Sequence, residues 1–273
     1  MWLAYLIVTP VALVAVLPII WIVSQSLKPL DELFKYPPDL IVRHPTLRNY
    51  QDLLIATSST SVPFSRYIFN SVLVTVVIVT VGVLVASMAA YPLAKANIPG
   101  GNAIFTLVIA ALTFPREVTA IPTYLVVSKL HMIDTYWALF LPSLGTAFGL
   151  FIMKQFMQQI PTALLEAAKL DGAGEFTIFF HLVLPMVKPA VATLAFLAFV
   201  QGWNETGPAL IYIRSETMRT LPLAIHTLGQ ANNVARAGAV AAANMLQFLP
   251  LLIAFIISRT RVIQTMAHTG LKG

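Results

Sequence analysis

Six long apolar runs constrain the fold of this chain more than any other feature of its sequence. The first run, residues 1–27, contains no charged residue at all. A helix needs about 20 mostly apolar residues to cross ~30 Å of hydrocarbon, and these runs are long enough. Their residues are apolar without alternation, which favours helices over a barrel. We therefore predict an all-α membrane protein, a single domain over 1–273, with six transmembrane spans at about 2–27, 67–92, 102–122, 136–154, 189–213 and 237–258.

The composition excludes most classes of soluble protein. Of the 273 residues 58% are hydrophobic and only 10% are charged, whereas soluble domains have about 25% charged residues. The 17 Lys and Arg against 11 Asp and Glu leave a net charge of +6, but the cations are scattered singly, so nucleic acid is not an expected partner. Cysteine is absent, and no phosphate-binding loop, His-Glu-x-x-His or Gly-x-Ser-x-Gly motif occurs. We expect neither a catalytic residue nor a metal site.

Two polar connections stand out by their length, 28–66 and 155–188. An even number of spans places both termini on one side of the membrane. Lys and Arg are usually in excess on the cytoplasmic side, but the two sides carry seven and ten of them, which does not decide the orientation.

The second connection has the most specific pattern. Residues 159–170 predict a short helix, with Pro161 in its first turn, where a missing N–H costs nothing. Asp171-Gly172 then breaks the helix, since glycine adopts positive φ readily. A second helix is predicted to begin near 174–176 and to stop before Leu184-Pro185. We expect the exposed apolar residues of this segment to pack into a partner: Leu164, Leu165, Ala168, Phe176 and Phe179.

This spacing resembles the EAA loop of ABC importer permeases. Glu166-Ala167-Ala168, three residues, Gly172, nine residues and then Leu182-Val183-Leu184-Pro185 follow that family's pattern, with Leu182 in place of the usual Ile. The resemblance implies a cytoplasmic coupling helix that contacts an ATPase subunit, between the fourth and fifth spans. It also implies that both termini are cytoplasmic and that 28–66 is extracytoplasmic. The residues to which it assigns the coupling role are Glu166, Ala167, Ala168, Asp171, Gly172, Leu184 and Pro185.

Further motifs are similar to the carbohydrate-uptake, maltose-type branch of that family: Tyr91-Pro92-Leu93-Ala94-Lys95, Trp203-Asn204-Glu205 and Thr220-Leu221-Pro222. What this implies is one permease subunit in a cell membrane, paired with a second six-span permease, normally as a heterodimer. Two cytoplasmic ATPase subunits, which bind ATP and Mg, and an extracytoplasmic solute-binding protein would complete the importer. No cofactor is expected in this chain itself, and the substrate would be a sugar or oligosaccharide.

Polar residues inside the predicted spans are candidates for the substrate path, because charged and polar groups are costly in hydrocarbon and usually face a bundle interior or a water-filled path. They are Asn204, Glu205, Asn244 and Gln247, with Trp203 or Tyr124 expected to stack on the sugar. The alternative for each is a hydrogen bond between helices.

Three other functions remain open on the sequence. An ion-driven secondary transporter needs titratable groups inside the membrane, for which only Glu205 is a clear candidate. An intramembrane hydrolase lacks its dyad, because His131 and His226 lie near loops. Within the importer class, a polyol or glycerol phosphate is an alternative to a sugar.

Overall fold

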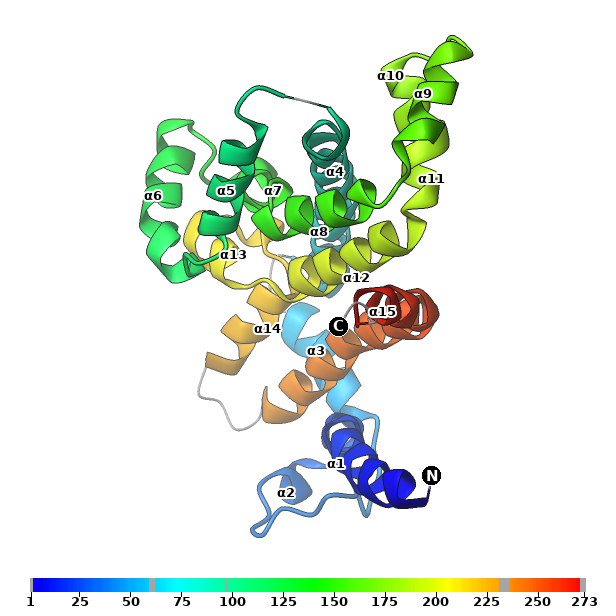
Figure 1. Ribbon diagram of the computed structural model, residues 1–273. Coiled ribbons are helices and arrows are strands. Elements are labelled where there is room, and N and C mark those ends of the chain that lie inside the picture. The colour runs from blue at the N-terminus through cyan, green and yellow to red at the C-terminus, as the bar shows by residue number, and fades with distance from the viewer. Residues whose placement is uncertain (1, 59–61, 97, 231–235, 271–273) are drawn as a thin grey trace. The chain divides into compact units, whose positions relative to one another are not determined.

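The computed structural model describes residues 2–58, 62–96, 98–230 and 236–270 (Figure 1). Within these ranges the chain forms helices and their connections, and no strand. The helices are α1 (Trp2–Leu27), α2 (Leu30–Leu33), α3 (Arg48–Ser58), α4 (Phe64–Lys95), α5 (Gly101–Ala111), α6 (Arg116–Lys129), α7 (Tyr136–Leu144), α8 (Ala147–Gln158), α9 (Thr162–Leu170), α10 (Glu175–Ile178), the π-helical η1 (Phe179–Val183), α11 (Leu184–Met186), α12 (Lys188–Asn204), α13 (Gly207–Tyr212), the 3₁₀ turn η2 (Glu216–Met218), α14 (Leu221–Gln230) and α15 (Ala237–Gly270).

The chain divides into two compact units. Unit 1 consists of Met1–Phe69 and Arg219–Leu252, and unit 2 of Asn70–Met218 and Ile253–Gly273. The helices α4 and α15 contribute to both. That 1–273 is a single domain stays a prediction. Each of the two units is described by itself.

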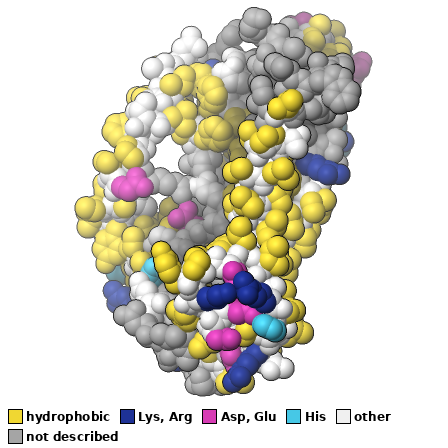
Figure 2. Space-filling model, turned by 90° about the horizontal axis from the view of Figure 1, so that it is seen from below, with side chains coloured by type: hydrophobic (Ala, Val, Ile, Leu, Met, Phe, Trp, Pro, Cys, Tyr) yellow, Lys and Arg dark blue, Asp and Glu magenta, His cyan; other side chains and the backbone are white. Residues whose placement is uncertain are grey.

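Within the part of the chain that the structure describes, long apolar helices form in four of the six predicted runs. Those long and apolar enough to cross a membrane are Val8–Leu27, Phe64–Lys95, Tyr136–Gln158 and Ala237–Arg259. A fifth candidate is the pair Glu175–Met186 and Lys188–Asn204, which is bent by 81°. Hydrophobic side chains cover much of the surface in Figure 2, as expected of helices that face lipid. These features are those of a multi-pass membrane protein.

The predicted span 102–122 is not one continuous helix. It forms α5 and then α6, with a break at 112–115. Pro115 precedes α6 in an extended conformation, with φ −64° and ψ 148°. A proline lacks the N–H for a helical hydrogen bond, and its ring disfavours the α conformation of the preceding residue, so the helix has to end and restart here.

The predicted span 189–213 is also interrupted. The helix α12 ends at Asn204, and Glu205 is extended, with φ −68° and ψ 116°. The next helix, α13, begins at Gly207 and has Pro208 in its first turn, where the proline needs no N–H partner. Glu205 therefore lies in a break between two helices and not inside a helical span.

The hydrophobic core of unit 2 positions the polar connection 155–188. Buried residues of α4, α8 and α12 pack with residues of α9, α10 and η1 into one cluster. Small residues bring these helices close together, since a Cβ at Gly149 of α8 would lie 3.3 Å from Ala86 of α4. Lys154 links α8 to α5, with its ammonium 3.3 Å from the centre of the Phe105 ring.

In unit 1 the connection after α1 is held by buried polar groups. The Asn49 amide donates to the carbonyl oxygens of Ser26 (2.9 Å) and Lys28 (2.7 Å). Glu32 is also buried, and it accepts hydrogen bonds from the backbone N–H groups of Arg43 and His44, both at 3.0 Å. This part of the predicted 28–66 loop is thus a folded structure.

Candidate functional site

The predicted helix of the polar connection forms as α9. Pro161 immediately precedes it, one position earlier than predicted, with φ −59° and ψ 131°. Leu165 is buried in the core of unit 2 and Ala168 is half-buried against it, whereas the other residues of α9 are exposed. Residues three apart share a helix face, so a single narrow edge attaches α9 to unit 2. The rest of its surface, including Glu166 and Ala167, is free of contacts with the core.

The turn after α9 explains the spacing between Ala168 and Gly172. The N–H of Ala173 donates to the carbonyl of Ala168 (2.9 Å), and the N–H of Gly172 donates to that of Lys169 (3.0 Å). These two bonds define a Schellman motif, in which the residue after the C-cap adopts a left-handed conformation. Gly172 occupies that position with φ 84°, after Asp171 as the C-cap. The predicted break at Asp171-Gly172 is thereby confirmed.

The second helix begins at Glu175, as predicted, but it does not stop before Leu184-Pro185. It continues from α10 through η1 and α11 to Met186. A proline inside a helix removes one hydrogen bond and clashes with the carbonyl one turn earlier, and here the preceding turn is π-helical, a wider form. Leu184 and Pro185 are half-buried, and Leu184 packs on the core of unit 2.

The apolar residues predicted to face a partner divide into two groups. Leu165 and Phe179 are 6% and 3% exposed and belong to the chain's own core, so for them the prediction was wrong, and Ala168 is half-buried against the same core. Leu164 and Phe176 are 42% and 69% exposed, and Leu170, which the pattern did not single out, is 89% exposed. Leu164 and Leu170 lie in α9 with the exposed Glu166, so α9 presents both apolar and acidic groups, and Phe176 adds an exposed apolar side chain from α10.

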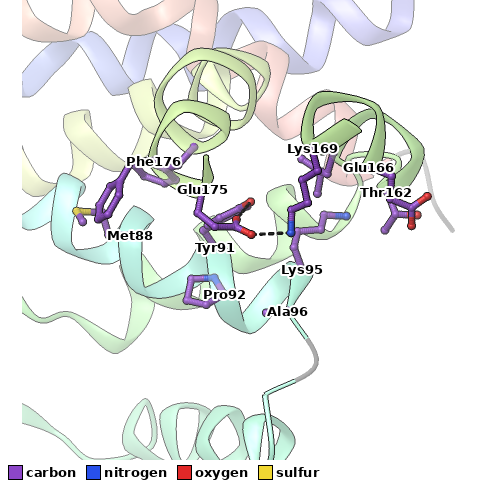
Figure 3. Close-up of a pocket in the computed structure, with 12 residues that line it drawn as sticks. Met88, Tyr91, Pro92, Lys95, Ala96, Thr162, Glu166, Lys169, Glu175 and Phe176 are labelled. Carbon is purple, nitrogen blue, oxygen red and sulfur yellow. Dashed lines mark hydrogen bonds and ion pairs between the residues drawn. The ribbon is translucent and has the colours of Figure 1, made fainter. Parts of the chain in front are cut away.

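A groove of about 530 Å³ separates the last turn of α4 from α9 and α10 (Figure 3). At one side the Tyr91 hydroxyl donates to Oε2 of Glu175 (2.9 Å), and Oε1 of Glu175 pairs with Nζ of Lys169 at 2.5 Å. At the other side Nζ of Lys95 donates to the carbonyl oxygen of Gln158 (3.1 Å) and to that of Ile160. The groove floor is mainly apolar, with Met88, Pro92 and Phe176 among its residues.

Sequence reasoning missed these contacts of Tyr91, Lys95 and Glu175. The first two residues stand in the Tyr-Pro-Leu-Ala-Lys motif that marks the resemblance, and Glu175 begins the second predicted helix. The sequence signal for these three residues was that each lies near the end of a predicted helix. The contacts that Tyr91 and Lys95 make join residues that are 63 to 84 positions apart, which no local pattern reveals.

The substrate-path candidates of unit 2 lie in different surroundings. Trp203 is 3% exposed and stacks on Phe199, with ring centres 5.8 Å apart. This burial favours a packing role over contact with a substrate. Tyr124 is half-buried and stacks on Tyr212 at 6.3 Å. It joins α6 to α13.

The two polar neighbours of Trp203 are more accessible. Asn204 is exposed, and its amide donates to the carbonyl of Val200 (2.9 Å). Glu205 is half-buried and lines a small cavity between α4, α7, α8 and α12, together with Ser143 and Gln201. A carboxylate in a helix break beside polar side chains can bind a polar group.

The remaining candidates, Asn244 and Gln247, lie on the part of α15 that belongs to unit 1. Asn244 is exposed and Gln247 is half-buried. They are one turn apart, as their spacing predicts.

Within the described residues, no group of three or more His, Cys, Asp or Glu side chains is placed to hold a metal ion.

Comparison with known proteins gives a family and a fold. Residues 78–268 match the family described as binding-protein-dependent transport system inner membrane component. The arabinooligosaccharides transport system permease protein AraQ of Halalkalibacterium halodurans is 31% identical over 96% of this chain and 93% of its own length. The sulfoquinovosyl glycerol transport system permease protein SmoH of Agrobacterium fabrum is 31% identical over 94% of this chain and 88% of its own length.

One solved structure shares the fold over 94% of both chains, with a TM-score of 0.83 and 22% identity. It is that of a bacterial ABC transporter involved in the import of the acidic polysaccharide alginate.

Proposed function

The chain belongs to the family of binding-protein-dependent transport system inner membrane components, and from that premise we propose that it is a permease subunit of an ABC importer for an oligosaccharide or related glycoside. The relatives named above transport arabinooligosaccharides and a sulfoquinovosyl glycerol, which share a glycosidic sugar. The chain itself performs no catalysis in this proposal. Two cytoplasmic ATPase subunits bind ATP and Mg, a second permease completes the path, and a solute-binding protein delivers the substrate from outside the cell membrane.

The observation that carries the proposal is the surface of α9. A nine-residue helix attached along one edge, with Glu166 and several apolar side chains exposed, is suited to bind a partner. The Schellman turn at Gly172 and the core contact of Leu165 fix its position. We assign the coupling contact to Glu166 and Ala167, and a supporting role to Ala168, Asp171, Gly172, Leu184 and Pro185.

This contact also sets the orientation. If α9 binds a cytoplasmic ATPase, the 155–188 connection and both termini are cytoplasmic, and 28–66 is extracytoplasmic. Tyr124, Asn204, Glu205, Asn244 and Gln247 then remain the candidates for the substrate path, since their side chains are at least partly accessible.

Charge reversal at Glu166 tests the coupling contact. We expect Glu166→Arg to reduce co-purification of the cognate ATPase from detergent-solubilised membranes at least tenfold, because it replaces an attraction by a repulsion at the contact. The matched control is Asp31→Arg, an exposed carboxylate in the 28–66 connection. Glu32 is unsuitable as a control, because its buried carboxylate holds the loop together.

Loss of the ATPase with Glu166→Arg but not with Asp31→Arg supports both the coupling contact and the orientation. Retention of the ATPase together with intact transport refutes the coupling contact at Glu166. The substrate class is tested separately, by uptake of labelled arabino-oligosaccharides and of glycerol 3-phosphate in cells that lack the chain. Loss of glycerol 3-phosphate uptake alone would refute the sugar assignment.

A further inference from the structure

The last turn of α4 contacts the chain on both sides of α9. Lys95 binds the carbonyls of Gln158 and Ile160, just before α9 begins. Tyr91 binds Glu175, the first residue of α10. We propose that Tyr91 and Lys95 are positioning residues that make α4 move together with α9 and α10, so that a displacement of α9 by the ATPase reaches a membrane span. This inference rests on the proposed function, since it assumes that α9 is the ATPase contact.

The first attachment passes through a single carboxylate. Glu175 accepts from Tyr91 with one oxygen and pairs with Lys169 with the other, so it joins α4, α9 and α10. Hydrogen bonds to an ionised acceptor are stronger than neutral ones. The Tyr91 ring also packs against Phe179, with ring centres 5.7 Å apart, which fixes the direction of its hydroxyl.

The second attachment binds backbone. The last carbonyl groups of a helix have no partner within it, and a cation is favourable at this negative end of the helix dipole. Lys95 supplies that cation at the end of α8 and holds the connection that leads into α9. Both acceptors are main-chain oxygens, so any shift of the backbone at 158–160 moves the groups that Lys95 binds.

Two attachments one turn apart on α4 restrict the rotation of α9 relative to α4 more than a single attachment does. Residues at i and i+4 lie on the same face of a helix, so Tyr91 and Lys95 project from one side of α4. Between them and α9 lies the groove of about 530 Å³, so these polar contacts bridge a gap that packing does not fill (Figure 3). Loss of one contact removes the link to α4 on one side of α9, and loss of both leaves α9 attached mainly by its Leu165–Ala168 edge.

The test uses the whole importer in proteoliposomes, with substrate uptake and ATP hydrolysis measured on the same vesicles. Tyr91→Phe keeps the ring and removes only the hydroxyl. We expect the substrate transported per ATP to fall about tenfold, the order of one hydrogen bond to a charged group, with an unchanged amount of assembled complex. The matched control is Tyr36→Phe, which alters a tyrosine that is 94% exposed.

Two further variants separate positioning from simple stability. Lys95→Met is expected to lower transport per ATP in the same way, and Lys95→Arg to restore most of it, because an arginine can reach the same carbonyl groups. The double variant Tyr91→Phe/Glu175→Ala is expected to be no worse than Glu175→Ala alone, since Tyr91 acts through Glu175.

Wild-type transport per ATP in both Tyr91→Phe and Lys95→Met would overturn the inference and leave the proposed function intact. Loss of assembled complex, with uptake and hydrolysis falling in equal proportion, would also overturn it by showing a purely structural role. Failure of the proposed function is recognised independently, because Glu166→Arg would then retain the ATPase.

Discussion

Replacement of Gly172 by alanine tests the turn on which the candidate site depends. Gly172 has φ 84°, and a Cβ added there would have no atom within 4 Å, so the cost lies in the backbone alone. A left-handed conformation costs an L-residue about 1–2 kcal/mol. Alanine in place of glycine returns about 0.4–1 kcal/mol by restricting the unfolded chain. The difference predicts a destabilisation of about 1 kcal/mol, which shifts the local opening equilibrium of the turn about fivefold.

The assay is hydrogen exchange of the two amides that close the turn, those of residue 172 and Ala173. Both are expected to exchange about fivefold faster in Gly172→Ala. Gly172→Asn is expected to show a smaller effect, because asparagine tolerates the left-handed conformation better than alanine.

Gly229→Ala is the matched control, since Gly229 lies in α14 and a Cβ there also meets no atom within 4 Å. In a helix this change is expected to stabilise the protein slightly. Unchanged exchange at residues 172 and 173 in Gly172→Ala would refute the assignment of the Schellman turn.

Three further substitutions probe packing and polar contacts elsewhere. Gly149→Leu should lower the free energy of unfolding by about 1–3 kcal/mol, because even a Cβ there lies 3.3 Å from side chains of α4 and α12. An unchanged melting temperature would contradict this packing. Gly238→Ala makes a Cβ overlap Oδ1 of Asn49 and should lower the free energy of unfolding by about 2 kcal/mol. The double variant Gly238→Ala/Asn49→Ala should be no less stable than Asn49→Ala alone. Hydrogen bonds, led by that from the Ser215 hydroxyl, lower the pKa of the Asp134 carboxyl. The ionised Asp134 carboxylate therefore contributes its full stabilisation of the folded protein above the ordinary pKa of 3.8. This contribution is lost as the pH falls through the lower pKa that the carboxyl has in the folded protein. Asp134→Asn should reproduce that loss at neutral pH as faster exchange of the 214–215 amides, and equal exchange would show that the charge is not needed.

Local patterns predicted the helical fold and the α9 turn well. The long apolar runs appear as α1, α4, α7–α8 and α15. Apolar side chains and lipid offer no hydrogen-bond partner, so the backbone N–H and C=O groups have to bind one another, as they do in a helix. The break at Gly172 was predictable for a similar reason, since the left-handed conformation of one residue depends mainly on that residue. Prolines were harder to interpret, because Pro115 stands at a helix break, just before α6, whereas Pro185 lies inside a helix.

The sequence by itself determined where the apolar helices form and that a short helix with a glycine stop lies between the fourth and fifth runs. The tertiary structure alone decided which faces are exposed: Leu165 is buried and Leu164 is not, and Glu32 is enclosed by its own loop. It also decided that Tyr91 meets Glu175, 84 residues away. The physical reason is that helix formation and turns depend on neighbours along the chain, whereas burial and polar pairing depend on which distant segments pack together.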